Sequence, residues 1–406
     1  MSNLVTKLTF AALLAGASLT AMASPGDGIR LGGSEGRLHP FIELEGRWDS
    51  KAYVDPNPAT ANDAADFIIH IRPGLKLSVP GDMTSVDLSA ALDVAQYMGN
   101  TDPITKDLSK VYAEAELGVT VNKNGVVGLE LDDTFRRSDR PQALSLGAGV
   151  VSNYNVLDLR VPFRPGGGAL TLNVNGGWAL ETYEALVTGN CTGSPDPLCA
   201  VKDLGYNELR AGAGVAWKFL PRTSALLDFG YFKRMPDLAT AADPAGFRVT
   251  TGLTGLITPH VGATLKAGYG SAGSTAVSES LGTWLATAEV EWQPSETTRV
   301  SLGYGHDLTV DPAAQYETNK LNAEARQLVA GRVALALSVG FDQLAYKTGS
   351  NTILRVSPTV GVEVTRWLRA ELGYAYTDRA ASTDAPVFAA NEYSKSEVWL
   401  KAVATY

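Results

Sequence analysis

The chain has 406 residues, of which 45% are hydrophobic and 19% charged, and its formal net charge is −9. Beyond the N-terminus no stretch reaches the roughly 18 consecutive apolar residues of a membrane-spanning helix, which excludes a helical membrane protein. The acidic balance argues against a nucleic-acid partner, which would require a basic surface. A membrane β-barrel fits this composition, because each of its strands shows lipid only every second side chain.

The first segment, residues 1–23, has the pattern of a cleaved signal peptide. It carries a positive charge at Lys7, a short apolar core and the small-residue cleavage site Ala21-Met22-Ala23. The mature chain would then begin with a short extension, residues 24–37, which we expect in the periplasm.

From residue 38 onward, apolar and polar side chains alternate with the period of two that is typical of strands. In 38–48, for example, Ile42 and Leu44 share one face while Glu43 and Glu45 share the other. The pattern predicts about 18 strands, and not fewer than about 16. They are expected near 38–48, 67–79, 84–95, 110–121, 126–136, 152–164, 168–180, 206–219, 223–234, 246–257, 260–269, 282–293, 297–307, 316–328, 331–342, 352–364, 367–377 and 396–406.

The connections between these strands alternate between short turns and long polar loops. The turns carry turn-forming residues, as in Pro80-Gly81-Asp82 and Asn122-Lys123-Asn124-Gly125. The loops are expected near 49–66, 96–109, 137–151, 181–205, 235–245, 270–281, 308–315, 343–351 and 378–395. Short periplasmic turns and long external loops are characteristic of outer-membrane barrels. Residues 38–406 are therefore predicted to form one all-β, transmembrane, antiparallel up-and-down barrel with both ends of the chain in the periplasm.

The loop 181–205 contains both cysteines of the chain, Cys191 and Cys199. Export to an oxidising compartment permits a disulfide, which we expect to staple this loop. No two of the four histidines are spaced for a metal, and we expect neither a metal nor a cofactor.

The tryptophans indicate which face meets the lipid. Hydrocarbon cannot solvate charges, so the apolar face must point outward and the sheet must close. Trp284 and Trp292 lie near opposite ends of one predicted strand, about 20 Å apart along the membrane normal, a spacing that approaches that of two aromatic girdles. The predicted girdle residues, all on the apolar face and near strand ends, are Trp48, Trp178, Trp217, Trp284 and Trp292.

The last strand alternates through Val398 and Leu400 to a terminal aromatic residue, Tyr406. This resembles the signal that the barrel-assembly machinery reads in the last strand of outer-membrane proteins. We therefore expect that machinery, together with outer-membrane lipid and lipopolysaccharide, among the partners.

The inward positions are rich in charge of both signs. A dry core could not hold them, because unpaired buried charges cost several kcal/mol each. Barrels of this strand number enclose an aqueous lumen unless something fills it. The candidate lumen-lining residues are Glu43, Arg47, Arg72, Glu114, Glu130, Arg160, Arg210, Arg248, Glu291, Arg326, Arg355 and Glu371.

The opening strands resemble those of the Putative beta-barrel porin 2 family of Gram-negative bacteria. The resemblance lies in His39-Pro40-Phe41-Ile42-Glu43-Leu44, in Trp48-Asp49-Ser50 and in Ile71-Arg72-Pro73-Gly74-Leu75. It implies an outer-membrane porin linked with the export of exopolysaccharide, acting with a periplasmic export protein.

Three classes of function remain open from the sequence. The first is a conduit, either for secreted polysaccharide or for the diffusion of small solutes. The second is a non-conducting structural or adhesive barrel that acts through loops such as 181–205. The third is a barrel enzyme, for which His306 lies near the outer end of a strand but on the lipid-facing side. We expect no enzymatic activity.

Overall fold

The computed structural model describes residues 28–31, 35–53, 64–99, 109–139, 144, 150–185, 197–237, 243–274, 280–311, 314–382, 384 and 392–406. The expected signal peptide and its cleavage site lie outside these residues, as do Cys191 and the side chain of Cys199. The signal peptide and the disulfide therefore stay predictions.

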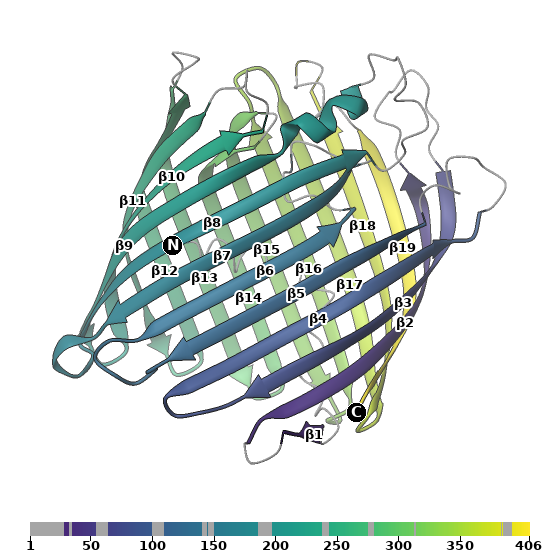
Figure 1. Ribbon diagram of the computed structural model, residues 1–406, viewed down its shortest axis with the longest axis horizontal. Coiled ribbons are helices and arrows are strands. Elements are labelled where there is room, and N and C mark those ends of the chain that lie inside the picture. The colour runs from purple at the N-terminus through teal and green to yellow at the C-terminus, as the bar shows by residue number, and fades with distance from the viewer. Residues whose placement is uncertain are drawn as a thin grey trace.

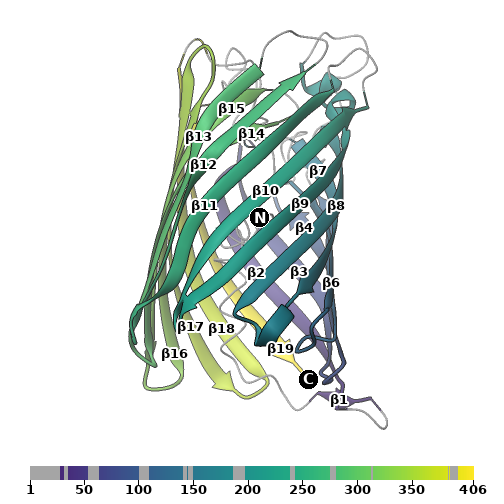
Figure 2. The same ribbon diagram turned by 90° about the vertical axis from the view of Figure 1, so that its left-hand side faces the viewer.

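The chain folds into a closed antiparallel barrel, as the alternating pattern predicts (Figures 1 and 2). A short strand, β1 (Ile29–Arg30), pairs with the first barrel strand at its beginning. The barrel strands are β2 Arg37–Tyr53, β3 Ala64–Val79, β4 Thr84–Tyr97, β5 Lys110–Val121, β6 Leu129–Ser138, β7 Val150–Phe163, β8 Leu170–Ala185, β9 Tyr206–Leu220, β10 Thr223–Pro236, β11 Pro244–Thr258, β12 Val261–Ser274, β13 Ser280–Ser295, β14 Thr298–Val310, β15 Gln315–Val329, β16 Val333–Ala345, β17 Ser350–Thr365, β18 Leu368–Ala381 and β19 Tyr393–Thr405.

Each strand pairs with its neighbour in the sequence, and β19 closes the ring on β2. The closing pair runs from Glu397 opposite Asp49 to Thr405 opposite Phe41. Tyr406 continues this seam, because its backbone N–H donates to the carbonyl of Pro40 at 3.0 Å. Closure satisfies the backbone groups that an open sheet edge would leave bare in a lipid environment.

The two ends of the barrel differ. At one end, which we call the turn end, the connections range from 221–222 to 122–128, and both β1 and the C-terminus lie there (Figure 1). At the other, the loop end, they reach 186–205, and a short 3₁₀ helix, η4 (Pro197–Leu204), packs beside β8. A second 3₁₀ turn, η3 (Pro165–Gly167), lies at the turn end.

Two expected long loops are corrected by the structure. The connections predicted near 308–315 and 343–351 are only 311–314 and 346–349, because β14 and β16 continue further than expected. Both strand tips are held there by buried apolar contacts, through Leu308 and Val310 on β14 and Leu344 on β16.

The outer face of the barrel is apolar, as a lipid-facing surface requires. Trp217, Trp284 and Trp292 are about half exposed on this face. The expectation that every girdle tryptophan lies near a strand end is wrong for Trp178, which lies in the middle of β8 because that strand runs on to Ala185. A further outward tryptophan, Trp367, lies at the turn between β17 and β18. Among the described residues no helix is long and apolar enough to cross a membrane.

Candidate functional site

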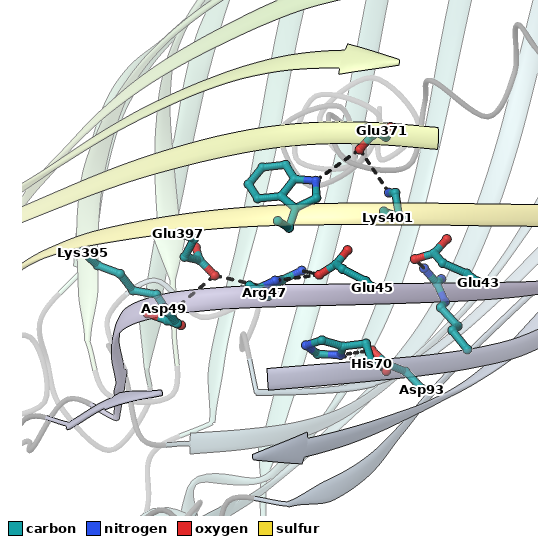
Figure 3. A network of polar contacts seen from close by, with 12 residues as sticks. Glu43, Glu45, Arg47, Asp49, His70, Asp93, Glu371, Lys395, Glu397 and Lys401 are labelled. Atoms are coloured by element: carbon teal, nitrogen blue, oxygen red, sulfur yellow. Dashed lines mark hydrogen bonds and ion pairs between the residues drawn. The ribbon is translucent and has the colours of Figure 1, made fainter. Parts of the chain in front are cut away.

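The inner wall of β18, β19 and β2 carries a network of charged side chains (Figure 3). Glu371 on β18 lies at the top of this network as drawn in Figure 3. Its carboxylate lies 3.2 Å from the ammonium of Lys401 and 3.2 Å from the guanidinium of Arg369, and it accepts a 3.3 Å hydrogen bond from the indole N–H of Trp399. The indole ring of Trp399 in turn faces the guanidinium of Arg47 at 5.9 Å.

The network continues along β2 and β19. Arg47 donates to Glu45 at 2.7 Å and to Glu397 at 3.3 Å. Lys395 lies 2.6 Å from Asp49 and 3.8 Å from Glu397. Charges of opposite sign therefore alternate across the seam that closes the barrel, so the wall has little local excess of either sign.

A second group of pairs crosses β2 to β6. Arg72 on β3 pairs with Glu114 on β5 and lies 3.8 Å from Glu43 on β2, and Arg136 on β6 lies 4.0 Å from Glu114. The contact of Arg72 with Glu114 joins strands that are not neighbours, because the two long side chains share the inner face and span β4 between them. Such pairs near water contribute about 0.2–1 kcal/mol each, so they order the wall more than they stabilise it.

All candidate residues chosen from the sequence lie on the inward parity of their strands, opposite the exposed apolar residues. Those outside the two groups above have their own partners: Glu130 with Arg160 at 3.5 Å, Arg210 with Asp158 at 3.7 Å, Arg248 with Asp307 at 2.8 Å, Arg355 with Asp342 at 2.5 Å, and Arg326 with Glu324. Glu291 pairs with Arg299 at 2.7 Å. The structure thus distributes the twelve candidates around the wall rather than gathering them into one cluster.

A cavity of about 850 Å³ occupies the turn-end part of the lumen. It is lined by the inner faces of β9 to β17, with glycine, serine, threonine and asparagine residues among charged and apolar ones. Glu291 and Arg355 are the two predicted residues that line it, together with charged residues such as Lys218 and Glu289. Hydroxyls, amides and charges of both signs make this wall suited to hydrated polar solutes.

The loop end of the lumen has a different character. Four buried apolar clusters lie at the loop ends of the strands. Their members are Tyr53, Ile68, Ala95, Tyr97, Tyr112 and Val151; Val150, Tyr183, Val201 and Tyr206; Ala272, Leu285, Leu308 and Val310; and Tyr316, Leu344 and Ile353. Packed side chains therefore narrow the lumen at this end.

One residue between β6 and β7, Leu144, lies at the far wall. It packs beside the cluster of Tyr316, Leu344 and Ile353, and its carbonyl accepts a 3.0 Å hydrogen bond from Arg379 on β18. In the strand order of the ring, β7 and β16 lie about half a turn apart. Leu144 therefore contacts the opposite side of the barrel from β7.

Sequence reasoning did not select several residues that the structure places in the site. Asp49, Lys395, Glu397, Lys401 and Trp399 belong to the seam network, and the same alternating pattern could have found them. Leu144 had no such signal, because it lies in a connection and its contacts are distant in sequence. The described residues include no group of three or more His, Cys, Asp or Glu side chains that could hold a metal ion.

Comparison with known proteins gives one family. A sequence model described as Putative beta-barrel porin 2 matches residues 27–406, nearly the whole chain. No curated protein matches the chain.

Among solved structures, similar folds include the outer membrane protein OpdK of Pseudomonas aeruginosa, with 12% identity and a TM-score of 0.47 over 91% of this chain and 99% of that one. The copper transporter OprC has 9% identity and a TM-score of 0.45 over 91% and 80% of the two chains. The FrpB iron transporter of Neisseria meningitidis has 9% identity and a TM-score of 0.45. The match covers 86% of this chain and 63% of the FrpB chain.

Proposed function

Since this chain belongs to the Putative beta-barrel porin 2 family, we propose that it forms a water-filled conduit across the outer membrane of a Gram-negative bacterium. The observation that carries the proposal is the inner wall, where ion pairs line the closing seam and hydroxyls and charged groups line a cavity of about 850 Å³. An apolar outside and a hydrated, charged inside are the arrangement by which a barrel lets polar solutes pass a bilayer.

The two ends of the barrel support an orientation. Outer-membrane barrels keep their short turns in the periplasm and their long loops outside. The turn end, with β1 and the C-terminus, is then periplasmic, and the loop end faces the exterior. In this orientation the polar cavity opens toward the periplasm, and the packed apolar clusters lie near the cell surface.

For the substrate we propose secreted exopolysaccharide, loaded from the periplasm with a periplasmic export protein as partner. A cavity at the periplasmic end favours loading from that side. Serine, threonine and asparagine side chains on its wall, such as Ser301, Thr264 and Asn322, can hydrogen-bond sugar hydroxyls. Outer-membrane lipid, lipopolysaccharide and the barrel-assembly machinery remain proposed partners.

A second candidate function is the diffusion of small solutes. It is favoured by the contact of Leu144 with the far wall, because a residue that packs on the inner faces of β15 to β17 takes up part of the cross-section of the lumen. A non-conducting barrel is the alternative against which both conduits are tested.

We do not propose an enzymatic role. His306, the residue weighed for catalysis, is only 4% exposed, stacks on Trp284 at 4.0 Å and is hydrogen-bonded to Thr283 and Asn319. These contacts support a packing role.

The test is single-channel conductance of the refolded protein in a planar bilayer, with neutral polysaccharide fragments of graded size added to one side at a time. For an export conduit we expect current steps that long fragments block from the periplasmic side. Block by small sugars alone, equally from both sides, would favour a diffusion porin. A folded barrel that gives no steps, even at high voltage and with the packing at its loop end disrupted by substitution, would refute both conduits.

A further inference from the structure

Strands β13 and β14 stop pairing with each other toward the loop end of the barrel. They pair from Trp292 opposite Val300 up to Ala286 opposite His306. Beyond that point β13 stays paired with β12 up to Ser280, and β14 stays paired with β15 up to Val310. Among the described pairs, none joins Ser280–Leu285 to Asp307–Val310. The wall of the barrel is therefore split between these two segments.

The burial of β14 reverses at the split. Leu302 and Tyr304 lie on the outward face and are 51% and 37% exposed. Leu308 and Val310 lie on the same face of the strand, but they are 1% and 8% exposed. They pack with Ala272 and Leu285, which have inward parity on β12 and β13. The end of β14 has therefore left the lipid-facing surface and turned into the lumen, and it approaches β12 directly.

Two arginines hold the displaced strand end. Arg248 on β11 donates to the carboxylate of Asp307 at 2.8 Å and to the carbonyl of Leu308 at 2.5 Å. Arg234 on β10 donates to the carbonyl of Val310 at 2.6 Å. Carbonyls at the split thus find donors on strands that are not their neighbours, as buried backbone groups must.

The other strand of the hairpin, β15, stays paired with β16 up to Glu317 opposite Ala345. Tyr316 on β15 is fully buried with Leu344 and Ile353, beside Leu144 from the connection between β6 and β7. Residues 307–311 and 314–318, which we call the hairpin tip, therefore lie between β10–β12 on one side and Leu144 on the other.

We infer that the hairpin tip is a gate at the outer end of the conduit, held closed by Arg234 and Arg248. Opening would return the end of β14 to the wall, where it could pair with the free edge of β13. Backbone hydrogen bonds to β13 would then replace those from the arginines, so two discrete arrangements of the same segment are available. The inference rests on the proposed conduit, because a gate has meaning only where solutes pass.

A charge reversal tests the closed state. Arg248→Asp places two carboxylates together, and Asp307→Arg does the same with two cations. Each single variant is expected to raise the open probability of the channel several-fold, and the double variant Arg248→Asp/Asp307→Arg to bring it back toward the wild-type value. Heat-dependent gel migration shows whether each variant is a folded barrel.

A disulfide tests the open state. If the pairing of Ala286 with His306 continued past the split, Trp284 would stand opposite Leu308. The variant Trp284→Cys/Leu308→Cys, oxidised, should hold the tip in the wall and increase conductance, and a reductant should reverse the increase. Wild-type protein treated with the reductant controls for Cys191 and Cys199.

The outcomes separate the gate from the conduit. Normal conductance that neither the charge reversals nor the disulfide changes would overturn the gate and leave the conduit standing. A folded barrel that stays silent even with the disulfide formed would overturn the conduit itself. Conductance that rises in the single variants, falls in the double variant and follows the state of the disulfide supports the gate.

Discussion

At the scale of single residues, this protein keeps many charges on its inner wall by placing each beside a partner. Glu371 is the best example, because Lys401, Arg369 and Trp399 all lie within 3.3 Å of its carboxylate. Removing one of several partners leaves the carboxylate bonded, so the fold should tolerate the loss. The charge of the wall nevertheless changes, and ions in the lumen should respond.

We predict that Lys401→Gln makes the channel more selective for cations. The change removes a positive charge 3.2 Å from Glu371 and leaves Arg369 as its remaining cation. The reversal potential in a KCl gradient should move toward the cation side by several millivolts, while Arg369 and Trp399 keep the Glu371 carboxylate bonded in the folded barrel. Lys401→Arg is the matched control and should behave as the wild type. An unchanged reversal potential would mean that this wall does not face the path of the ions.

At the scale of the strand, the register shows where the bilayer lies. Val261 pairs with Trp292 and Tyr269 pairs with Trp284, so Leu265 on β12 is midway between the levels of the two tryptophans. Leu265 is 57% exposed on the outer face, whereas its neighbour Thr264 has inward parity and pairs with Glu289. The two adjacent residues should therefore meet different solvents.

The substitution Leu265→Arg should destabilise the barrel by about 2–4 kcal/mol, the cost of an arginine at the bilayer midplane. Thr264→Arg is the control. It places the same side chain in the lumen opposite Glu289 and should cost less than about 1 kcal/mol. Urea denaturation of both variants folded in lipid vesicles measures the difference. Equal effects at the two positions would contradict the assignment of the lipid-facing side.

The last strand carries a separate prediction about assembly. Tyr406 is 70% exposed, and its backbone rather than its ring makes the seam contact with Pro40. Loss of the ring should leave the finished barrel intact. We predict that Tyr406→Ser lowers the amount of folded protein in the outer membrane of cells several-fold, while Tyr406→Phe preserves it. Refolding of purified Tyr406→Ser into lipid vesicles should remain normal, since the assembly machinery plays no part there. Equal amounts of the wild type, Tyr406→Ser and Tyr406→Phe in cells would show that the ring of Tyr406 is not part of an assembly signal.

At the scale of the whole molecule, the barrel is asymmetric along its axis. Polar and small residues line the cavity at the turn end, and apolar clusters narrow the loop end. Charges of both signs alternate across the closing seam, so the lumen as a whole has no strong preference for one sign.

Weak ion selectivity is therefore expected of the wild-type channel. In a tenfold KCl gradient, the reversal potential should stay well below the roughly 59 mV limit of a perfectly selective one-charge channel. The reversal potential is measured in the same planar bilayers as the single-channel conductance. A value close to the limit would show that one sign of charge dominates the narrowest part of the lumen.

Much of the architecture could be read from the sequence alone. The number of strands, the closed barrel and the two faces follow from an alternation that is local along the chain. Water and lipid act on every second side chain, so a run such as Ile42 to Leu44 reveals its two faces without any knowledge of the partner strand. The inward position of the charged residues was predictable for the same reason.

Tertiary structure alone decided which of these residues meet and where the wall departs from the regular pattern. Arg72 reaches Glu114 two strands away across the inner face of the sheet. Leu144 reaches Arg379 across the ring, because closure brings distant segments together. Leu308 and Val310 continue the apolar alternation of Leu302, so no local pattern distinguishes a strand end that faces lipid from one folded into the lumen. That choice depends on donors and apolar surfaces supplied by other strands, above all Arg234, Arg248 and Leu285.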